Sequence, residues 1–173
     1  MQRRLDPLAD EVFDLLVIGA GIVGACAAWD GALRGLRVAL IDRGDFGSGT
    51  SANSLKIIHG GLRYLQNLDF VRLRESSRER STWMRIAPHL VAPLPVLIPC
   101  RGAGLQSLPI LAGAATVNDL LTPDRNRGLP EERRLPAARV LSRRACLDLV
   151  PDLDAQSLQG GVLLHDAQMY SSE

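Results

Sequence analysis

Three glycines in the spacing G-x-G-x-x-G constrain this chain more than any other feature. They are Gly19, Gly21 and Gly24. They stand between an apolar run, residues 13–19, and an alanine-rich stretch, residues 22–34. The first glycine of such a motif allows a tight turn, the second lets a phosphate approach the backbone, and the third lets the helix pack closely on the strand. The pattern therefore predicts a strand, a turn and a helix of the Rossmann type.

A second strand is expected directly after this helix. Gly35 stands where a left-handed residue ends a helix, and residues 36–41 are again mostly apolar. A strand, a helix and a strand joined by short connections form the right-handed crossover of a parallel sheet. The expected fold class is therefore α/β, with the first strand covered on both faces. Residues 44–54 are rich in Gly, Ser, Thr and Asn, which predicts a loop.

An acidic residue ends the second expected strand. Asp42 lies eighteen residues after Gly24, where a carboxylate can accept hydrogen bonds from the ribose hydroxyls of an adenosine and disfavours a 2′-phosphate. FAD and NAD share this arrangement, so it leaves the cofactor open. The alternative without a cofactor is a glycine-rich turn next to a surface aspartate.

The rest of the chain contains further helix and strand signals. Asp69 can N-cap a helix that runs towards residue 87 through a strongly polar middle, residues 74–80. The prolines of residues 91–99 favour an extended segment, residues 105–121 are expected to be helical, and Ser142 can begin a short helix. Residues 160–164 are expected to start a strand. Because so little sequence follows, we expect this strand to open a new, uncovered sheet and the chain to be the N-terminal portion of a longer protein.

Composition excludes several classes of protein. The chain of 173 residues is 46% hydrophobic and 23% charged with a net charge of +1, which is typical of a globular protein and disfavours nucleic-acid binding. Residues 125–144 contain seven arginines and two glutamates, which we interpret as a solvated face rather than a docking patch. The three cysteines lack the spacing of a zinc site, so no metal is expected. No signal peptide or spanning segment is visible, which predicts a cytoplasmic protein.

The loop after the second strand carries the most specific sequence. Residues 48–65 read SGTSANSLKIIHGGLRYL, which resembles a flavin-contacting segment of the FAD-dependent glycerol-3-phosphate dehydrogenases. The resemblance begins near Phe13, continues to the end of the chain and covers about the front third of such a protein. It implies a Rossmann-type FAD-binding domain of the glutathione-reductase-like kind. Residues 1–12 would be an N-terminal extension, residues 13–173 the first part of the oxidoreductase, and a substrate domain would begin after about residue 90.

The same resemblance implies an activity. Such an enzyme oxidises sn-glycerol 3-phosphate to dihydroxyacetone phosphate by hydride transfer to flavin N5 and passes the electrons to quinone or another acceptor. Peripheral association with the cytoplasmic face of the inner membrane is a further expectation, and no nucleic-acid partner is expected. The NAD alternative is disfavoured because a nicotinamide enzyme has no need of the residue 48–65 segment.

Site residues follow from the motif and the resemblance together. The expected catalytic residues are His59, which is the candidate base, and Arg63 and Tyr64, which would face the substrate; an arginine can bind phosphate through two hydrogen bonds. The expected cofactor-binding residues are Gly19, Ala20, Gly21, Ile22, Val23, Gly24, Asp42, Arg43, Gly49, Thr50, Ser51, Ser54, Lys56, Ile58, His59, Gly60 and Gly61.

Departures from the family pattern leave two alternatives open. Leu55 replaces a usual hydroxyl residue, Asp42 replaces the more usual Glu, and His165 stands where Tyr is common. An amine or hydroxy-acid oxidoreductase with the same flavin domain is one alternative. A non-catalytic FAD-binding module is the other.

Overall fold

The computed structural model describes residues 6–171 and divides into two compact units. Of the described residues, unit 1 comprises residues 6–56 and Ser171, and unit 2 comprises Ile57–Tyr170. Residues 1–5 of the expected N-terminal extension and residues 172–173 at the end of the expected oxidoreductase part lie outside the described residues.

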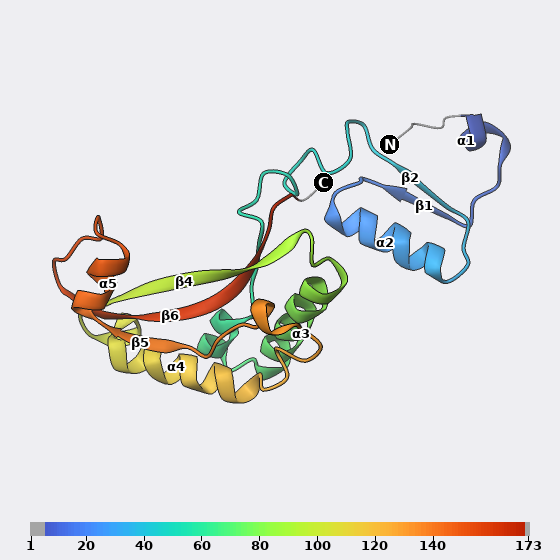
Figure 1. The fold of residues 1–173 in the computed structure, drawn as a ribbon. Helices are drawn as coiled ribbons and strands as arrows, with labels where there is room; N and C mark the ends of the chain where they lie inside the picture. The colour runs from blue at the N-terminus through green and yellow to red at the C-terminus, as the bar shows by residue number, and fades with distance from the viewer. Residues whose placement is uncertain (1–5, 172–173) are drawn as a thin grey trace. The chain divides into compact units, whose positions relative to one another are not determined.

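Unit 1 is built on the expected strand, helix and strand. After a short helix α1 (Asp6–Asp10), strand β1 (Leu15–Ile18) and strand β2 (Val38–Ile41) form a parallel pair in register from Leu15 with Val38 to Ile18 with Ile41. Helix α2 (Ile22–Leu33) connects them and packs along one face of the pair (Figure 1). Gly35 has φ of +83° directly after the end of α2. The α/β prediction for this region is confirmed.

Only one face of this small sheet is covered. A Cβ at Gly31 of α2 would lie 3.0 Å from Leu15 Cδ2 and 3.1 Å from Val38 Cγ2, so the helix packs tightly on that face. Leu16 and Ile18 alternate with the covered residues and are 54% and 78% exposed. The expectation that β1 is covered on both faces is therefore wrong for the part of the chain that the structure describes.

Unit 2 is an antiparallel sheet with one long central strand. Its strands are β3 (Ile57–Ile58), β4 (Val91–Arg101), β5 (Arg139–Ser142) and β6 (Leu158–Met169). β6 pairs with β4 along almost its whole length and with β3 and β5 on its other edge. The expectation that residues 160–164 open a new, uncovered sheet is thus wrong, because β6 completes a sheet whose other strands precede it in the chain.

The prolines of β4 explain its place at the edge of the sheet. Pro93, Pro95 and Pro99 occupy alternate positions, so their missing N–H groups all belong to the same edge of the strand. The other edge retains its donors and pairs with β6. Proline is tolerated in a sheet where its nitrogen faces away from a partner strand, so this spacing directs β4 to the edge.

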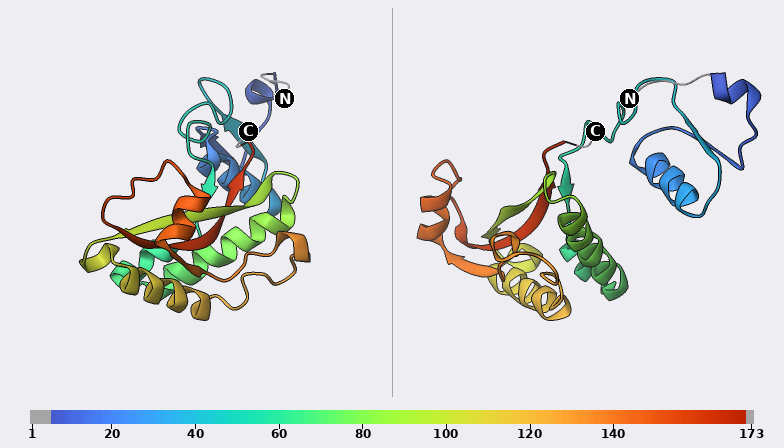
Figure 2. Two further views of the ribbon diagram at one scale, coloured as in Figure 1. Left: turned by 60° about the vertical axis from the view of Figure 1, so that its left-hand side comes forward. Right: turned by 45° about the vertical axis from the view of Figure 1, so that its right-hand side comes forward.

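Helices cover both faces of the sheet in unit 2 (Figures 1 and 2). The elements are η1 (Leu62–Asn67), α3 (Phe70–Ile86), η2 (Gly104–Gln106), α4 (Leu108–Leu121), η3 (Glu131–Arg133) and α5 (Arg143–Leu149). Val162 packs with residues of α4 and the adjacent Leu163 packs with residues of α5. Since neighbouring side chains of a strand point to opposite faces, α4 and α5 lie on opposite sides of β6.

Two of the expected helix starts are confirmed by their caps. The Asp69 carboxylate accepts a hydrogen bond from Arg72 N at 3.0 Å, and Ser142 Oγ accepts one from Ala145 N at 3.2 Å. The expected helix at residues 105–121 is shorter than predicted and begins at Leu108, with Pro109 in its first turn. A proline costs little there because the first-turn N–H groups have no intrahelical acceptor.

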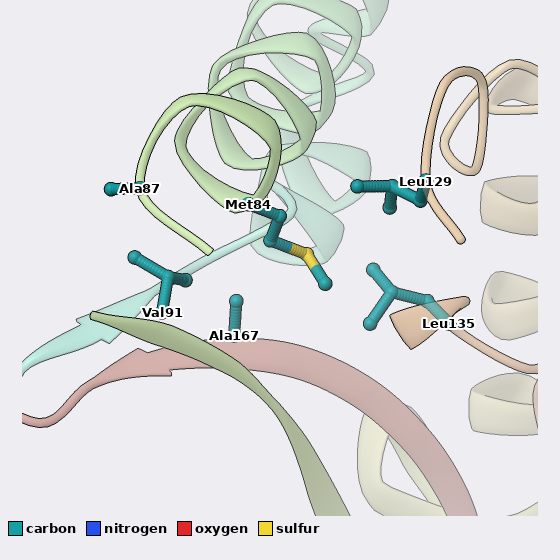
Figure 3. Close-up of a cluster of buried hydrophobic side chains, with 6 residues drawn as sticks. All are labelled: Met84, Ala87, Val91, Leu129, Leu135 and Ala167. Carbon is teal, nitrogen blue, oxygen red and sulfur yellow. The ribbon is translucent and has the colours of Figure 1, made fainter. Parts of the chain in front are cut away.

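Helix α3 is anchored to one end of β6 by an apolar cluster (Figure 3). Its buried members are Met84, Ala87, Val91, Leu129, Leu135 and Ala167. Met84 extends from α3 towards Ala167 of β6 and Leu135 (Figure 3). This cluster fixes the stretch of β6 in which Asp166 precedes Ala167.

Candidate functional site

The expected site residues fall into two groups, because the boundary between the units follows Lys56. Unit 1 carries the glycine turn, Asp42 and the first half of the residue 48–65 segment. Unit 2 carries the remainder of that segment, from Ile57 onwards. Each group is described within its own unit.

The glycine turn of unit 1 requires glycine at two of its positions, for two different reasons. Gly19 has φ of +102°, a conformation that residues with a Cβ rarely adopt. A Cβ at Gly24 would overlap the carbonyl oxygen of Gly19 and would lie 3.4 Å from Val17 Cγ1. The start of α2 therefore approaches β1 as closely as the motif requires.

Asp42 is tied to this turn through both of its carboxylate oxygens. Oδ2 accepts a hydrogen bond from Ala20 N at 2.8 Å, and Oδ1 accepts one from Gly44 N at 2.8 Å. These backbone donors lower the pKa of Asp42 below its ordinary value. A carboxylate offers about four acceptor positions, so each oxygen retains capacity for a further donor such as a hydroxyl.

The loop that follows β2 returns to the first turn of α2. Ser51 Oγ accepts a hydrogen bond from Ile22 N at 2.9 Å, and a Cβ at Gly21 would lie 3.2 Å from the same oxygen. The amides of Val23 and Gly24 belong to the same turn, in which N–H groups lack intrahelical acceptors. A helix start with free amides attracts an anion such as a pyrophosphate. The donor set of this turn therefore fits the phosphates of a dinucleotide.

The other expected cofactor residues of unit 1 lie in the loop after β2 and in the first turn of α2. Ser54 Oγ contacts Ser51 O at 3.4 Å and accepts a hydrogen bond from Lys56 N at 3.2 Å, and Lys56 itself has φ of +57°. The remaining members are exposed, and they are Ile22, Val23, Arg43, Gly49 and Thr50.

Strand pairing brings His59 to Asp166 in unit 2. Ile57 is opposite Gln168 and Ile58 is opposite Ala167 in the antiparallel register. One further step along this register sets His59 against Asp166, and His59 Nδ1 lies 2.8 Å from Asp166 Oδ2. The His59 side chain is otherwise open, with 71% of its surface exposed.

A buried arginine holds the other oxygen of Asp166. Oδ1 accepts hydrogen bonds from Arg80 Nη1 at 2.7 Å and from Gly60 N at 2.8 Å. Arg80 is 3% exposed, and its Nη1 also donates to His165 O at 3.1 Å. Burial lowers the pKa of Arg80 from its ordinary value, while the charge of Asp166 opposes that shift. Asp166 thus connects β6, α3 and residues 59–61 in one hydrogen-bond network.

The two glycines after His59 are required by packing within unit 2. A Cβ at Gly60 would overlap the Arg80 guanidinium. Gly61 has φ of +89°, and a Cβ there would lie 3.0 Å from Leu73 Cα of α3. The structure therefore gives this pair a role that the sequence analysis did not anticipate, in addition to the expected approach to a flat ring.

Arg63 and Tyr64 follow on η1. Arg63 is exposed and forms no hydrogen bond or ion pair with any residue between 6 and 171, whereas Tyr64 is half-buried. Neither is hydrogen-bonded to His59 or Asp166 within the described chain. The guanidinium of Arg63 is therefore available to a ligand, but its role rests on the resemblance.

Sequence reasoning missed Arg80 and Asp166. Arg80 was interpreted as part of the polar middle of its helix, yet Leu73, Ser77, Arg80 and Met84 are buried at helical spacing along α3. An arginine at an otherwise core-facing position is a signal for a buried acidic partner. That signal does not identify the partner, because Asp166 is 86 residues away.

Unit 2 has two cavities that are not lined by any of the expected catalytic residues. One, lined in part by Asn118, His165 and Asp166, has about 20 Å³ of space, which suits one water molecule. The other, of about 230 Å³, is lined by α3 and by residues 124–127, with arginines from both, and by none of the expected site residues. In the described part of the chain, no helix combines the length and apolar character needed to cross a membrane.

The chain is similar in sequence to known FAD-dependent oxidoreductases. The family model described as FAD dependent oxidoreductase matches residues 14–172. A glycerol-3-phosphate dehydrogenase of Synechocystis is 38% identical over 99% of this chain, and glycerol-3-phosphate dehydrogenase 2 of Mycobacterium tuberculosis is 42% identical over 92%. The mitochondrial glycerol-3-phosphate dehydrogenase of Rattus norvegicus is 39% identical over 90%. The chain spans 30%, 26% and 21% of these three relatives, respectively.

Solved structures share the fold. The glycerol-3-phosphate dehydrogenase of Bacillus halodurans, complexed with FAD, superposes with a TM-score of 0.61 at 25% identity, covering 95% of this chain and 23% of that one. An L-α-glycerophosphate oxidase of Mycoplasma pneumoniae with bound FAD gives a TM-score of 0.59 at 16% identity, covering 92% of this chain and 39% of that one. With its glycine turn, its fold and a family match over almost all of its length, the chain belongs to the FAD-dependent oxidoreductase family.

Proposed function

We propose that this chain supplies FAD-binding and catalytic residues to an enzyme that oxidises sn-glycerol 3-phosphate to dihydroxyacetone phosphate. The observation that carries the proposal is an identity of 38% to 42% with three glycerol-3-phosphate dehydrogenases over at least 90% of the chain. Because the chain spans less than a third of each relative, the reaction is proposed for a whole protein of their kind.

The proposed cofactor is FAD, and unit 1 fits its ADP half. The first-turn amides of α2 would bind the pyrophosphate, and Asp42 would accept hydrogen bonds from the ribose. Thr50, Ser51, Ser54 and Lys56 supply further hydroxyl and ammonium groups. The segment from Ile58 to Gly61 would contact the isoalloxazine. Asp166 Oδ1 accepts hydrogen bonds from Gly60 N in that segment and from Arg80 Nη1, and these bonds keep the segment in place.

Substrate oxidation requires a proton acceptor and a phosphate ligand. When bound, FAD supplies the acceptor for the hydride that leaves the carbinol carbon. His59 Nε2 takes the proton of the carbinol hydroxyl, so a C–H bond and an O–H bond break and a carbonyl forms. Arg63 binds the phosphate through its guanidinium, and Tyr64 lies beside it in sequence on η1. Reduced FAD would pass its electrons to quinone or another acceptor. We place the enzyme in the cytoplasm or peripherally on the inner membrane.

A chimera tests the substrate assignment. In it, this chain replaces the matching N-terminal segment of the Synechocystis glycerol-3-phosphate dehydrogenase, and activity is followed by a dye-coupled assay. Arg63→Met should lower kcat/KM for glycerol 3-phosphate by about 30- to 150-fold, because it removes a charged two-point contact of about 2 to 3 kcal/mol. Flavin content should not change.

The control variant is Arg127→Met, which instead removes an exposed arginine that lines the cavity of about 230 Å³ in unit 2. It should leave kcat/KM unchanged. Glycerol, which lacks the phosphate, should lose far less activity than glycerol 3-phosphate in the Arg63 variant. Equal losses for both substrates, or a loss in the Arg127 variant alone, would remove Arg63 from the phosphate site.

A further inference from the structure

We propose that Asp166 is the positioning residue of His59: it fixes the imidazole as the tautomer protonated at Nδ1, so that Nε2 is free to accept a proton. The part of this inference that concerns proton transfer from substrate rests on the proposed function. The part that concerns the tautomer rests on the contacts within unit 2 alone.

The contacts around Asp166 set the direction of its hydrogen bond to His59. An ionised carboxylate only accepts hydrogen bonds. Oδ1 already accepts two, from Gly60 N and Arg80 Nη1, and Oδ2 lies 2.8 Å from His59 Nδ1. His59 must therefore donate through Nδ1. In a neutral imidazole the other nitrogen is then an acceptor, and that nitrogen is Nε2.

Burial on one side keeps this arrangement rigid although the ring itself is open. Asp166 is 8% exposed and Arg80 is 3% exposed, and the next residue of β6, Ala167, is fully buried in the cluster with Met84. The Arg80 guanidinium pairs with the carboxylate through a charge-assisted hydrogen bond, as a buried charge requires. His59 thus combines a fixed Nδ1 with an exposed ring, as a positioned general base requires.

The carboxylate also favours the product of proton transfer. When Nε2 takes a proton, His59 becomes an imidazolium whose Nδ1–H still faces Asp166 Oδ2. A buried carboxylate in this position orients the base and stabilises the charge that it acquires, without itself becoming protonated. Arg80 acts one step further away, because it holds Asp166 and does not contact His59 through a hydrogen bond in the described chain.

The variant Asp166→Asn tests the tautomer directly. Gly60 N and Arg80 Nη1 both donate towards the Oδ1 position, so the amide oxygen should occupy it and the amide NH₂ should face His59. An NH₂ group donates, so Nδ1 becomes the acceptor and the proton moves to Nε2. Long-range ¹H–¹⁵N spectra of the 173-residue chain, recorded where the imidazole is neutral, report which nitrogen carries the proton. The chain has three histidines, and His59→Gln assigns the signal.

A half-buried ion pair in the same unit supplies the control. Arg125 and Asp119 lie 3.2 Å apart with side chains 13% and 23% exposed. Asp119→Asn perturbs that pair and should leave His59 protonated at Nδ1. Backbone amide spectra of both variants show whether unit 2 is folded. If Asp166→Asn does not fold, Asp166→Glu provides a second measurement, because its carboxylate can still accept a hydrogen bond from His59 Nδ1.

The expected result is an Nδ1–H signal for His59 in the parent chain and in Asp119→Asn, and an Nε2–H signal in Asp166→Asn. An Nε2–H signal in the parent, or an unchanged tautomer in Asp166→Asn, would overturn the inference. In the chimera, Asp166→Asn should also lower kcat by roughly 100-fold or more with little change in KM. A tautomer switch without a loss of kcat would confirm the positioning role and refute His59 as the base.

Discussion

Unit 1 and unit 2 hold their polar groups by different means. In unit 1, among residues 8–56, only Ala20, Gly31 and Ala39 are buried, and Asp42 and Ser51 are held by backbone amides. In unit 2, three apolar clusters surround the sheet, and a buried arginine holds Asp166. The shape of the glycine turn therefore depends on local backbone geometry, whereas the position of His59 depends on a charge pair formed across 86 residues of sequence.

The largest effect is expected from Arg80→Met, which should affect unit 2 alone. It leaves the Asp166 carboxylate buried without its cation, and breaking a buried pair in this way costs about 3 to 5 kcal/mol. Urea unfolding can be followed by Trp83 fluorescence in a Trp29→Phe background, because the two tryptophans lie in different units. The midpoint should fall markedly. Arg72→Met, which removes an exposed pair with Asp69, should change the free energy of unfolding by less than about 1 kcal/mol; equal effects would contradict the comparison.

Asp42→Ala should have the next largest effect and should act on unit 1. We expect FAD affinity to fall by about 1.5 to 3 kcal/mol, because charge-assisted hydrogen bonds to the ribose are lost. Asp42→Asn retains one acceptor for Ala20 N and should lose less. Equilibrium titration with FAD measures both, with Asp45→Ala as the control for a neighbouring carboxylate. If parent and Asp42→Ala bound FAD equally tightly, Asp42 would not be the ribose ligand.

Gly24→Ala tests the role of backbone packing in the glycine turn. The new Cβ would overlap Gly19 O, and overpacking of this kind costs about 1 to 3 kcal/mol. FAD affinity should fall by roughly 10- to 100-fold if the displaced turn binds the cofactor. Gly113→Ala adds the same methyl group on α4, where no atom lies within 4 Å, and should leave FAD affinity unchanged. Equal FAD affinity in Gly24→Ala and in the parent chain would show that the close packing of the turn does not matter for cofactor binding.

The smallest effect concerns pH and unit 2. Burial, together with the charges of Arg125 and Arg80, lowers the pKa of His165 below its ordinary value. The unfolded chain therefore takes up a proton near pH 6.5 that the folded chain does not, so this contribution to stability is present above about pH 6.5 and is lost as the pH falls. The Trp83 unfolding midpoint should be lower at pH 5.5 than at pH 7.5. His165→Gln should reduce that difference; an undiminished difference would assign the pH dependence to other groups.

Local features of the fold could be predicted from the sequence. The glycine turn, the left-handed Gly35 and the helix caps at Asp69 and Ser142 each depend on a few adjacent residues. The residue 48–65 segment likewise indicated the family, because its motif is continuous in the chain. Whether its residues contact FAD stays a prediction.

Long-range pairing could not be predicted in the same way. The Gly160 and Gly161 pair indicated a strand, but nothing local shows that β6 is the central strand of a sheet with β4, which ends almost 60 residues earlier. The Arg80 and Asp166 pair was hidden for the same reason. The prolines of β4 did carry a topological signal, because their alternate spacing leaves one edge of the strand able to pair.

A competition titration tests directly whether the glycine turn of unit 1 binds FAD. The 173-residue chain is titrated with FAD, and the bound flavin is followed by its visible absorbance after removal of free ligand. We expect saturable binding of FAD that a large excess of NAD does not displace and that Gly24→Ala weakens while Gly113→Ala does not. Displacement of FAD by NAD, or equal FAD binding by parent and Gly24→Ala, would contradict the assignment of the glycine turn of unit 1 to the flavin cofactor.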